Sequence, residues 1–334
     1  MGLEKNDCMV KKILLSSSIL AIALVLIMPS KAYSQDPEFT QFYANPLYLN
    51  PAFAGSKICP RVSMNHRNQW PGLSGTFITN SVSYDQHVDA LQGGLGLLVM
   101  TDDAAKGTLT QTHISGIYSY ELPITRKFSI RAGFQATYFQ KSLDWNKLTF
   151  GDMIDPRRGF VYTTNDIPRG GQVANADFSA GLLGIHESYF FGFAAHHLTQ
   201  PNESLVVGDS RLPIKFTAHA GANIPLGNQR YSTNDATISP NIMFRHQGTF
   251  MQLNMGLYFS KGPLVAGVWY RNNDAFITLI GFESGIFRFG YSYDLTVSRL
   301  NNTNTAGSHE VSLGLQFNCK PKRRRYRTIS CPSF

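Results

Sequence analysis

The chain beyond residue 34 lacks long hydrophobic runs and carries little charge. Charged residues make up only 16% of the sequence, which is low for a soluble surface, whereas 43% of the residues are hydrophobic. No apolar stretch after residue 34 approaches the ~20 residues that a membrane-spanning helix needs. Only helices and closed barrels satisfy their backbone hydrogen bonds in lipid. If this part of the chain crosses a membrane, it must therefore do so as a closed β-barrel.

Motifs of catalytic and metal sites are also missing. The nine histidines are scattered, without an H-E-x-x-H sequence or a metal-spaced Cys/His cluster. Gly-x-Ser-x-Gly is absent, and Gly170-Gly171 is not followed by the Lys-Ser/Thr of a phosphate loop. Asp152, Asp155 and Asp166 lack EF-hand spacing. We predict no enzyme, no cofactor and no metal, although a Ser–His–Asp arrangement across strands, as in an outer-membrane hydrolase, stays open because triads depend on geometry.

A two-residue alternation of apolar and polar side chains is what the sequence does have. From Val311 to Phe317 every odd residue is apolar and every even residue is small or polar. Successive side chains of a strand point to opposite faces, so such a segment has one apolar and one polar face. Many such segments, together with 12% aromatic residues, predict an all-β fold: a transmembrane antiparallel β-barrel of about fourteen strands. The expected strands are 61–68, 77–87, 92–101, 109–122, 128–142, 176–186, 189–198, 214–225, 236–247, 249–259, 264–271, 275–282, 286–294 and 309–319.

The lengths of the connections predict the orientation of the barrel. The three longest, 143–175, 199–213 and 295–308, are all odd-numbered connections, so they lie at the same end of the barrel. Outer-membrane barrels have short periplasmic turns and long outer loops. We therefore predict that both termini are periplasmic, although the connection 226–235 is long for a periplasmic turn.

The N-terminus resembles a secretory signal. Lys11 and Lys12 precede an uncharged stretch over 13–28, followed by Ala32-Tyr33-Ser34. A membrane anchor is the alternative, but the stretch is shorter than a spanning helix. We predict a signal peptide over 1–34, with Met1 or Met9 as its start, and hence a protein of the Gram-negative outer membrane, in contact with its lipid.

A basic tail explains most of the formal charge of +8. Six positive residues lie in the segment 320–334, namely Lys320, Lys322, Arg323, Arg324, Arg325 and Arg327. With the charge confined to one tail of a secreted chain, no nucleic acid is expected as a partner. The expected domains are thus the signal peptide 1–34, a leader 35–60, the barrel 61–319 and the basic periplasmic tail 320–334.

Three cysteines follow the signal peptide. Cys59 precedes the first expected strand and Cys319 ends the last, so barrel closure would bring them together. We predict a Cys59–Cys319 disulfide in this oxidising compartment. A pair of Cys319 with Cys331, or free thiols, are the alternatives.

The leader is not strand-like. Residues 35–56 read QDPEFTQFYANPLYLNPAFAGS, and the two Asn-Pro pairs impose extended or turn geometry. The apolar side chains between them need cover, either at the periplasmic mouth or inside the lumen as a plug. A leader that packs on the barrel without any partner role is the alternative.

This leader closely resembles the start of the PorP/SprF family of type IX secretion system membrane proteins, which opens Q-D-P-x-F-T-Q-aromatic and continues N-P-L-x-L-N-P-A-aromatic-A-G. Further pieces that resemble the family are RNQWPG at 67–72, GLGL at 94–97, YRNNDA at 270–275, GYSYD at 290–294, GSHE at 307–310 and CPSF at 331–334. Candidate plug or partner contacts in the leader motif are Gln41, Phe42, Asn45, Pro46, Leu49, Asn50, Pro51, Phe53 and Gly55.

The resemblance implies a fourteen-stranded outer-membrane barrel that works with type IX export. It implies binding of machine subunits or of secreted cargo with C-terminal sorting domains, such as gliding adhesins. A passive pore for small solutes is the alternative function. Arg288, Asp294 and Glu310 fall on predicted lumen faces, where they form either an internal salt-bridge network or a polar passage.

Overall fold

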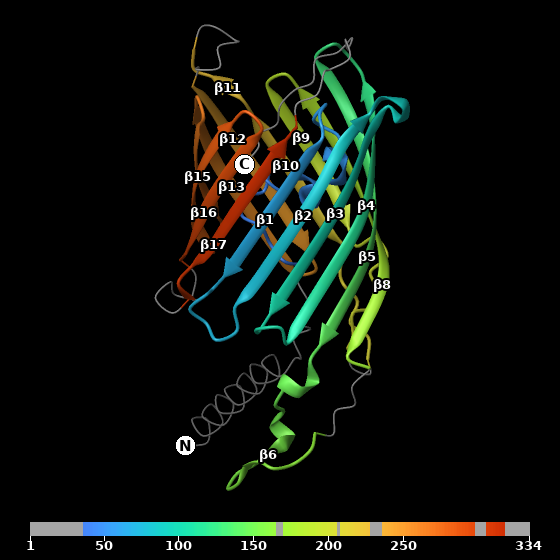
Figure 1. Cartoon of the computed structure of the whole chain (residues 1–334), viewed down its shortest axis with the longest axis vertical. Coiled ribbons are helices and arrows are strands. Elements are labelled where there is room, and N and C mark those ends of the chain that lie inside the picture. The colour runs from blue at the N-terminus through green and yellow to red at the C-terminus, as the bar shows by residue number, and fades with distance from the viewer. Residues whose placement is uncertain (1–35, 165–169, 206–207, 228–235, 298–304, 318–334) are drawn as a thin grey trace, which may run out of the picture. The chain divides into compact units, whose positions relative to one another are not determined.

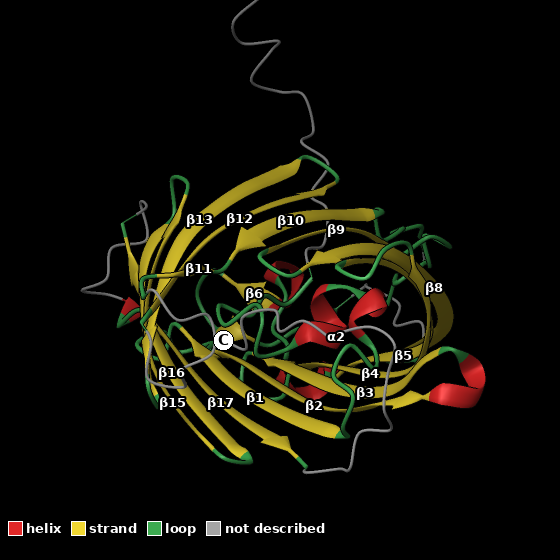
Figure 2. Cartoon of the chain, turned by 90° about the horizontal axis from the view of Figure 1, so that it is seen from above, coloured by secondary structure: helices red, strands yellow, loops and turns green. Residues whose placement is uncertain are grey.

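A closed antiparallel sheet dominates the protein. The structure is a computed structural model that describes residues 36–164, 170–205, 208–227, 236–297 and 305–317. The expected signal peptide, the basic tail and Cys319 lie outside these residues. In the described part of the chain one sheet of fifteen strands closes through pairing of β1 with β17. The two-residue β11 continues β10 along β12, so fourteen strands surround the lumen and the predicted fold is confirmed (Figures 1 and 2).

The bounds of the strands lie close to those expected. They are β1 Arg61–Gln69, β2 Phe77–Val88, β3 Gly93–Ala104, β4 Leu109–Pro123, β5 Phe128–Leu143, β8 Gln172–His186, β9 Tyr189–His196, β10 Lys215–Ala222, β11 Ile224–Pro225, β12 Thr237–Gln247, β13 Phe250–Lys261, β14 Leu264–Arg271, β15 Ala275–Ser284, β16 Phe287–Thr296 and β17 Ser308–Gln316. A small separate hairpin, β6 Ile154–Asp155 and β7 Gly159–Phe160, lies in the connection after β5.

Most strands differ from the expected bounds by three residues or fewer at either end, and two elements need comment. β8 begins at Gln172 rather than at 176, because Gln172 to Asn175 already pair with β5. The expected strand 214–225 is interrupted between β10 and β11. The interruption lies opposite Pro240 of β12, which has no backbone N–H to donate to the ladder.

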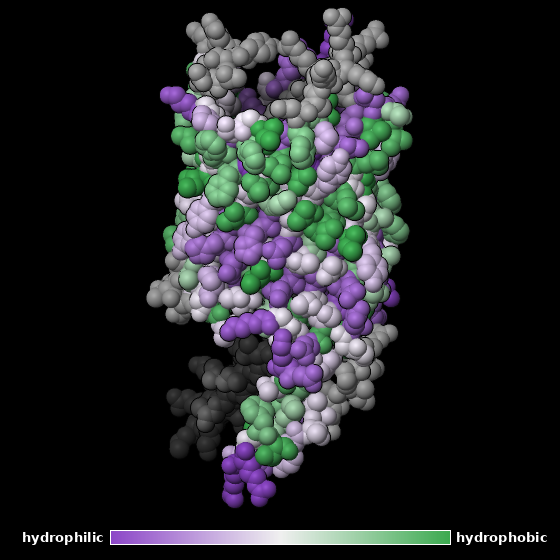
Figure 3. Space-filling model, viewed as in Figure 1, coloured by the Kyte–Doolittle hydropathy of each residue, from purple (hydrophilic) through white to green (hydrophobic). Residues whose placement is uncertain are grey.

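The two-residue period sorts the side chains of the wall. On β1, Arg61, Ser63, Asn65 and Arg67 are buried toward the lumen, whereas Met64 is exposed on the outside. Hydrophobic residues cover much of the outer wall on the face shown in Figure 3. Charged residues on a lipid-facing wall would cost ~2–4 kcal/mol each at the bilayer midplane, which explains why the polar side chains point inward. No helix among the described residues is long and apolar enough to span a membrane.

The two ends of the barrel differ. One, the short-turn end, carries the connections 89–92, 124–127, 187–188, 262–263 and 285–286, together with the longer 226–236. The other, the long-loop end, carries 144–171, 197–214 and 297–307 among its connections.

The leader lies inside the ring of strands. It forms a short helix, α2 (Pro46–Leu49), and a 3-10 turn, η1 (Pro51–Phe53) (Figure 2). Each begins with a proline, whose missing N–H is no loss at the first helical position. The Asn50 side chain separates the two and caps η1 by accepting a hydrogen bond from the Ala52 backbone N–H at 2.9 Å.

Candidate functional site

The leader crosses the lumen from one end of the barrel to the other. Its first described residue, Asp36, contacts His197 and Lys215, which flank a connection of the long-loop end. At the short-turn end the backbone N–H of Phe317 donates to the carbonyl oxygen of Pro60 at 3.0 Å. The described chain therefore begins toward the long-loop end and ends toward the short-turn end. The position of both termini in the periplasm stays a prediction, because the termini themselves lie outside the described residues.

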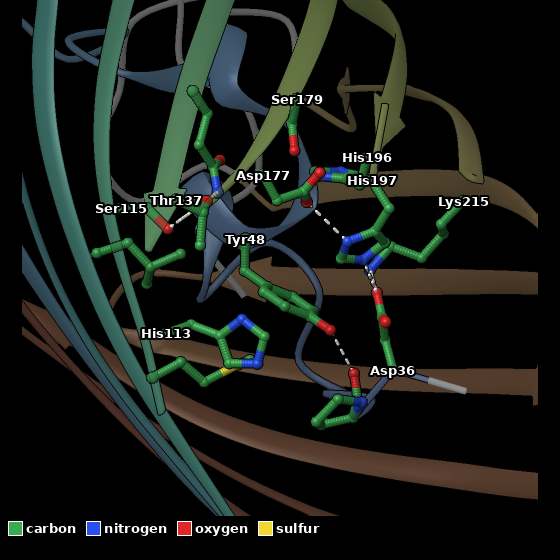
Figure 4. A pocket seen from close by; sticks show the side chains of 14 residues that line it. Asp36, Tyr48, His113, Ser115, Thr137, Asp177, Ser179, His196, His197 and Lys215 are labelled. Carbon is green, nitrogen blue, oxygen red and sulfur yellow. Dashed lines mark hydrogen bonds and ion pairs between the residues drawn. The ribbon is translucent and has the colours of Figure 1, made fainter. Parts of the chain in front are cut away.

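An ionic cluster holds the beginning of the leader. The Asp36 carboxylate contacts the Lys215 ammonium and lies 2.8 Å from Nε2 of His197. Nδ1 of His197 lies 2.8 Å from the carboxylate of Asp177 on β8 (Figure 4). The Tyr48 hydroxyl donates to the Pro37 carbonyl oxygen and fastens the same segment. Because both ring nitrogens of His197 are engaged by carboxylates, this histidine has no free nitrogen with which to activate a serine.

The cluster shifts the pKa of Asp36 in the leader and the pKa of His197 in the wall connection. Burial raises the pKa of Asp36, but the charges of His197 and Lys215 outweigh it and hold the pKa well below its usual range. Burial lowers the pKa of His197, but Asp36 and the hydrogen bond to Asp177 outweigh it and raise the pKa to about 9. At neutral pH the imidazolium and the carboxylate are therefore both charged and paired.

These shifts predict that the leader end loosens in alkali. Since the pKa of His197 is raised from 6.5 to about 9, its contribution to stability is complete below pH 6.5 and is lost as the pH rises through 9. The contribution of Asp36, whose pKa is lowered, is lost only as the pH falls below its usual 3.8. Hydrogen exchange of the backbone amides of residues 38–41 should therefore accelerate between pH 7 and 10 beyond the intrinsic rate. In His197→Gln the additional acceleration should vanish; if it persists, another group controls the leader end.

A small cavity adjoins the cluster. It measures about 40 Å³ and is lined by Asp36, Tyr48 and inward residues of the neighbouring strands (Figure 4). Nε2 of His113, Nε2 of His196 and Oε1 of Gln135 have no hydrogen-bond partner among the described residues. In the part of the chain that the structure describes, no group of three or more His, Cys, Asp or Glu side chains is placed to hold a metal ion.

A second polar cluster grips the leader further along. The Glu310 carboxylate accepts the backbone N–H groups of Thr40 at 2.5 Å and of Gln41 at 3.2 Å. Arg67 lies 2.9 Å from Asp294 and 3.5 Å from Glu310, and its guanidinium also donates to the Thr40 hydroxyl. The lumen wall thus binds the main chain of the leader as well as its side chains.

Aromatic contacts fill the space between the polar clusters. The ring of Phe42 packs edge-on against that of Trp269, with the ring centroids 4.9 Å apart. Tyr43 packs against Phe190 in the same way, with the centroids 5.4 Å apart. Leader and wall together form one buried apolar cluster, which also includes Leu47. Burial of each such side chain contributes roughly 1.5–3 kcal/mol.

A row of small wall residues accommodates the second half of the leader. In the strand register Gly94 pairs with Ser119, Ser119 with Gly133 and Gly133 with Gly181, so the four form one level across β3, β4, β5 and β8. A Cβ on Gly133 would lie 2.3 Å from the Ala52 backbone nitrogen. The Ser119 hydroxyl donates to the Ala54 carbonyl oxygen at 2.6 Å. The backbone of residues 50–55 can lie directly on the wall because this row has almost no side chains.

The sequence-predicted leader positions all lie in this interface. Gln41, Phe42, Asn45, Pro46, Leu49, Asn50, Pro51, Phe53 and Gly55 are buried. Of the predicted lumen residues, Asp294 and Glu310 belong to the second polar cluster, whereas Arg288 lies apart and pairs with Glu283 at 2.9 Å.

Other residues of the interface were not singled out from the sequence. They are Asp36, Glu38, Arg67, Arg131, Asp177, His197, Lys215, Arg245 and Arg271. A charged residue within an otherwise alternating strand is the signal that could have found those of the wall.

Cys59 forms a disulfide, and its expected partner Cys319 lies outside the described residues. The Gln316 side-chain amide donates to the Cys59 carbonyl oxygen at 3.1 Å, so the end of β17 lies beside Cys59. A non-reducing peptide map should contain a Cys59–Cys319 cross-link, and its disappearance in Cys319→Ser serves as the control. Recovery of Cys59 joined to Cys331 would instead assign the bond to the tail.

Comparison with known proteins identifies relatives at the level of the family. The family model "Type IX secretion system membrane protein PorP/SprF" matches residues 31–315. Comparison with curated proteins finds no match.

Several solved outer-membrane barrels resemble the chain in structure. Omp33 of Acinetobacter baumannii is 10% identical, with a TM-score of 0.42 over 79% of this chain and 100% of its own. A FadL homologue of Pseudomonas aeruginosa is 13% identical, with a TM-score of 0.40 over 84% of this chain and 96% of its own. The KdgM porin is 10% identical, with a TM-score of 0.37 over 77% of this chain and 99% of its own. Likenesses of this degree carry no argument about function.

Proposed function

The chain belongs to the PorP/SprF family of type IX secretion system membrane proteins, and we propose that it serves there as a sealed docking barrel. In this role it binds secreted cargo with a C-terminal sorting domain, or subunits of the export machinery, and catalyses no reaction. Such cargo includes adhesins of the gliding type. The protein is an outer-membrane β-barrel, and its short turns face the periplasm in this proposal.

The filled lumen is the observation that carries the proposal. The leader is bound at its beginning by the Asp36 cluster, in the middle by Glu310 and at its end by the small-residue row. Three cavities beside the leader, each lined by described residues, measure about 20 to 40 Å³. A docking component can be sealed, whereas a passive pore for solutes needs an open passage.

The long-loop end offers a surface for partners. Phe160, Val161 and Tyr162, in and after the β6–β7 hairpin, are each more than half exposed. Exposed apolar patches of soluble regions commonly mark contact sites. This hairpin is therefore the first place to expect contact with a cargo domain.

An affinity pull-down from the native envelope tests the function. The tagged, detergent-extracted chain should retain a large secreted protein with a C-terminal sorting domain, or export subunits, as identified by mass spectrometry. A Phe160→Ser/Tyr162→Ser variant should retain less of it, and a matched Thr163→Ala variant should not differ from the wild type. A barrel that purifies alone and conducts ions in a planar bilayer would favour the passive pore instead.

A further inference from the structure

The first half of the leader occupies a site that is built like a peptide-binding site. Residues 36–43 contact the wall through side chains and the main chain, but none of the residues 36–60 belongs to a strand of the described sheet. The barrel closes through β1 and β17 without them. The segment can therefore leave its place without breaking any ladder of the wall.

Two cations of the wall are paired by the leader. Lys215 of β10 pairs with Asp36. Arg245 of β12 pairs with Glu38, and its Nη1 lies 2.5 Å from Oε1 of that carboxylate. Among the described residues neither cation has a second carboxylate within ion-pair distance. Both side chains are about nine-tenths buried. Without the leader this side of the lumen would present two unpaired cations.

The two leader carboxylates are themselves held by several groups of the wall. Asp36 exchanges two hydrogen bonds with the Gln247 amide, at 3.2 and 3.3 Å. Glu38 accepts from Gln252 at 3.1 Å and lies 3.9 Å from Arg271. Burial raises the pKa of Glu38, but Arg271 and Arg245 outweigh it and lower the pKa to about 2.

The positions that follow the carboxylates are recognised in other ways. Glu310 accepts the backbone N–H groups of both Thr40 and Gln41, where the chain bends, so these two bonds recognise a bent main chain rather than a particular side chain. The ring of Phe42 lies against Trp269 and 5.1 Å from the Arg245 guanidinium. The site therefore recognises two acidic residues, then a bent main chain, then an aromatic ring.

We infer that this half of the lumen is a binding site for an acidic and aromatic peptide segment, which the chain fills with its own residues 36–43. A partner segment of the same chemistry would replace the leader end and pair with Lys215 and Arg245. The inference rests on the proposed function, since it names the kind of segment that a secreted or machine partner would insert.

A labelled peptide with the sequence of residues 36–43, acetylated and carrying a fluorophore at its C-terminus, is the probe. The receptor is the purified full chain with a weakened leader, Asp36→Asn/Glu38→Gln/Phe42→Ala, and folding is verified by heat-dependent gel mobility. Fluorescence anisotropy should show binding at least tenfold tighter than to the wild-type chain, whose own leader competes. A matched peptide with Asn and Gln in place of its two acids should bind the variant at least tenfold more weakly.

Equal binding of the acidic and the amide peptide would overturn the inference. Absence of binding would also overturn it. If the variant conducts ions, its lumen is empty and yet does not bind the peptide. If the variant remains closed, the replaced side chains are not what holds the segment in place. If the triple variant does not fold, the isosteric Asp36→Asn/Glu38→Gln variant replaces it. A chain that retains its partner in the pull-down but shows no peptide binding loses this inference and keeps the proposed function.

Discussion

Replacement of Arg67 by methionine should lower the free energy of unfolding by about 3 to 5 kcal/mol, the cost of removing one partner from a buried ion pair. Arg67 is 2% exposed and faces Asp294 at 2.9 Å and Glu310 at 3.5 Å. Without it, both carboxylates stay buried with less compensating charge, although Arg271 remains 3.5 Å from Asp294. Urea unfolding in lipid vesicles, followed by gel mobility, measures the loss.

The matched control is Arg211→Met at the same end of the barrel. Arg211 and its partner Asp209 are 67% and 69% exposed and 3.7 Å apart. Exposed ion pairs contribute roughly 0 to 1 kcal/mol, so this variant should unfold almost like the wild type. If Arg67→Met also loses less than ~1 kcal/mol, water within the lumen already solvates the two carboxylates and the cluster is not a stabilising element.

The wall of the barrel was predictable because its signal is local. The alternation of side chains depends on neighbouring residues only, so the expected strand 264–271 coincides with β14. The break opposite Pro240 was missed because its consequence appears on the partner strand. The polar faces were predictable for the same reason. Asp294 and Glu310 lie on the polar side of the alternation in their strands, and this alternation alone places both side chains on the inner face.

The partners within the lumen were not predictable in this way. Asp36 and Lys215 are 179 residues apart, and their contact depends on the closure of the whole sheet and on the direction in which the leader runs through it. Parity shows that a side chain points inward but not which leader residue it meets. The small-residue row is similar: Gly133 and Gly181 become neighbours only through the pairing of β5 with β8.

Replacement of Gly133 by valine should displace the second half of the leader and open the lumen. The Cβ would lie 2.3 Å from the Ala52 nitrogen and 2.4 Å from the Pro51 carbonyl carbon, both backbone atoms that cannot rotate away. Overpacking of this kind costs typically 1–3 kcal/mol, which the leader avoids by leaving the wall. Planar-bilayer recordings should then show conductance steps that the wild-type chain lacks.

Gly116→Val separates this effect from a general response of the barrel to valine. Gly116 lies on the neighbouring strand β4 with its Cβ direction open, and it is exposed on the outer wall. The added side chain meets lipid there, so this variant should stay closed. If Gly133→Val is closed as well, the strand must have moved outward to keep the leader in place. The seal would then be more stable than the wall that surrounds it, and a partner could not open the lumen by displacing residues 50–55 alone.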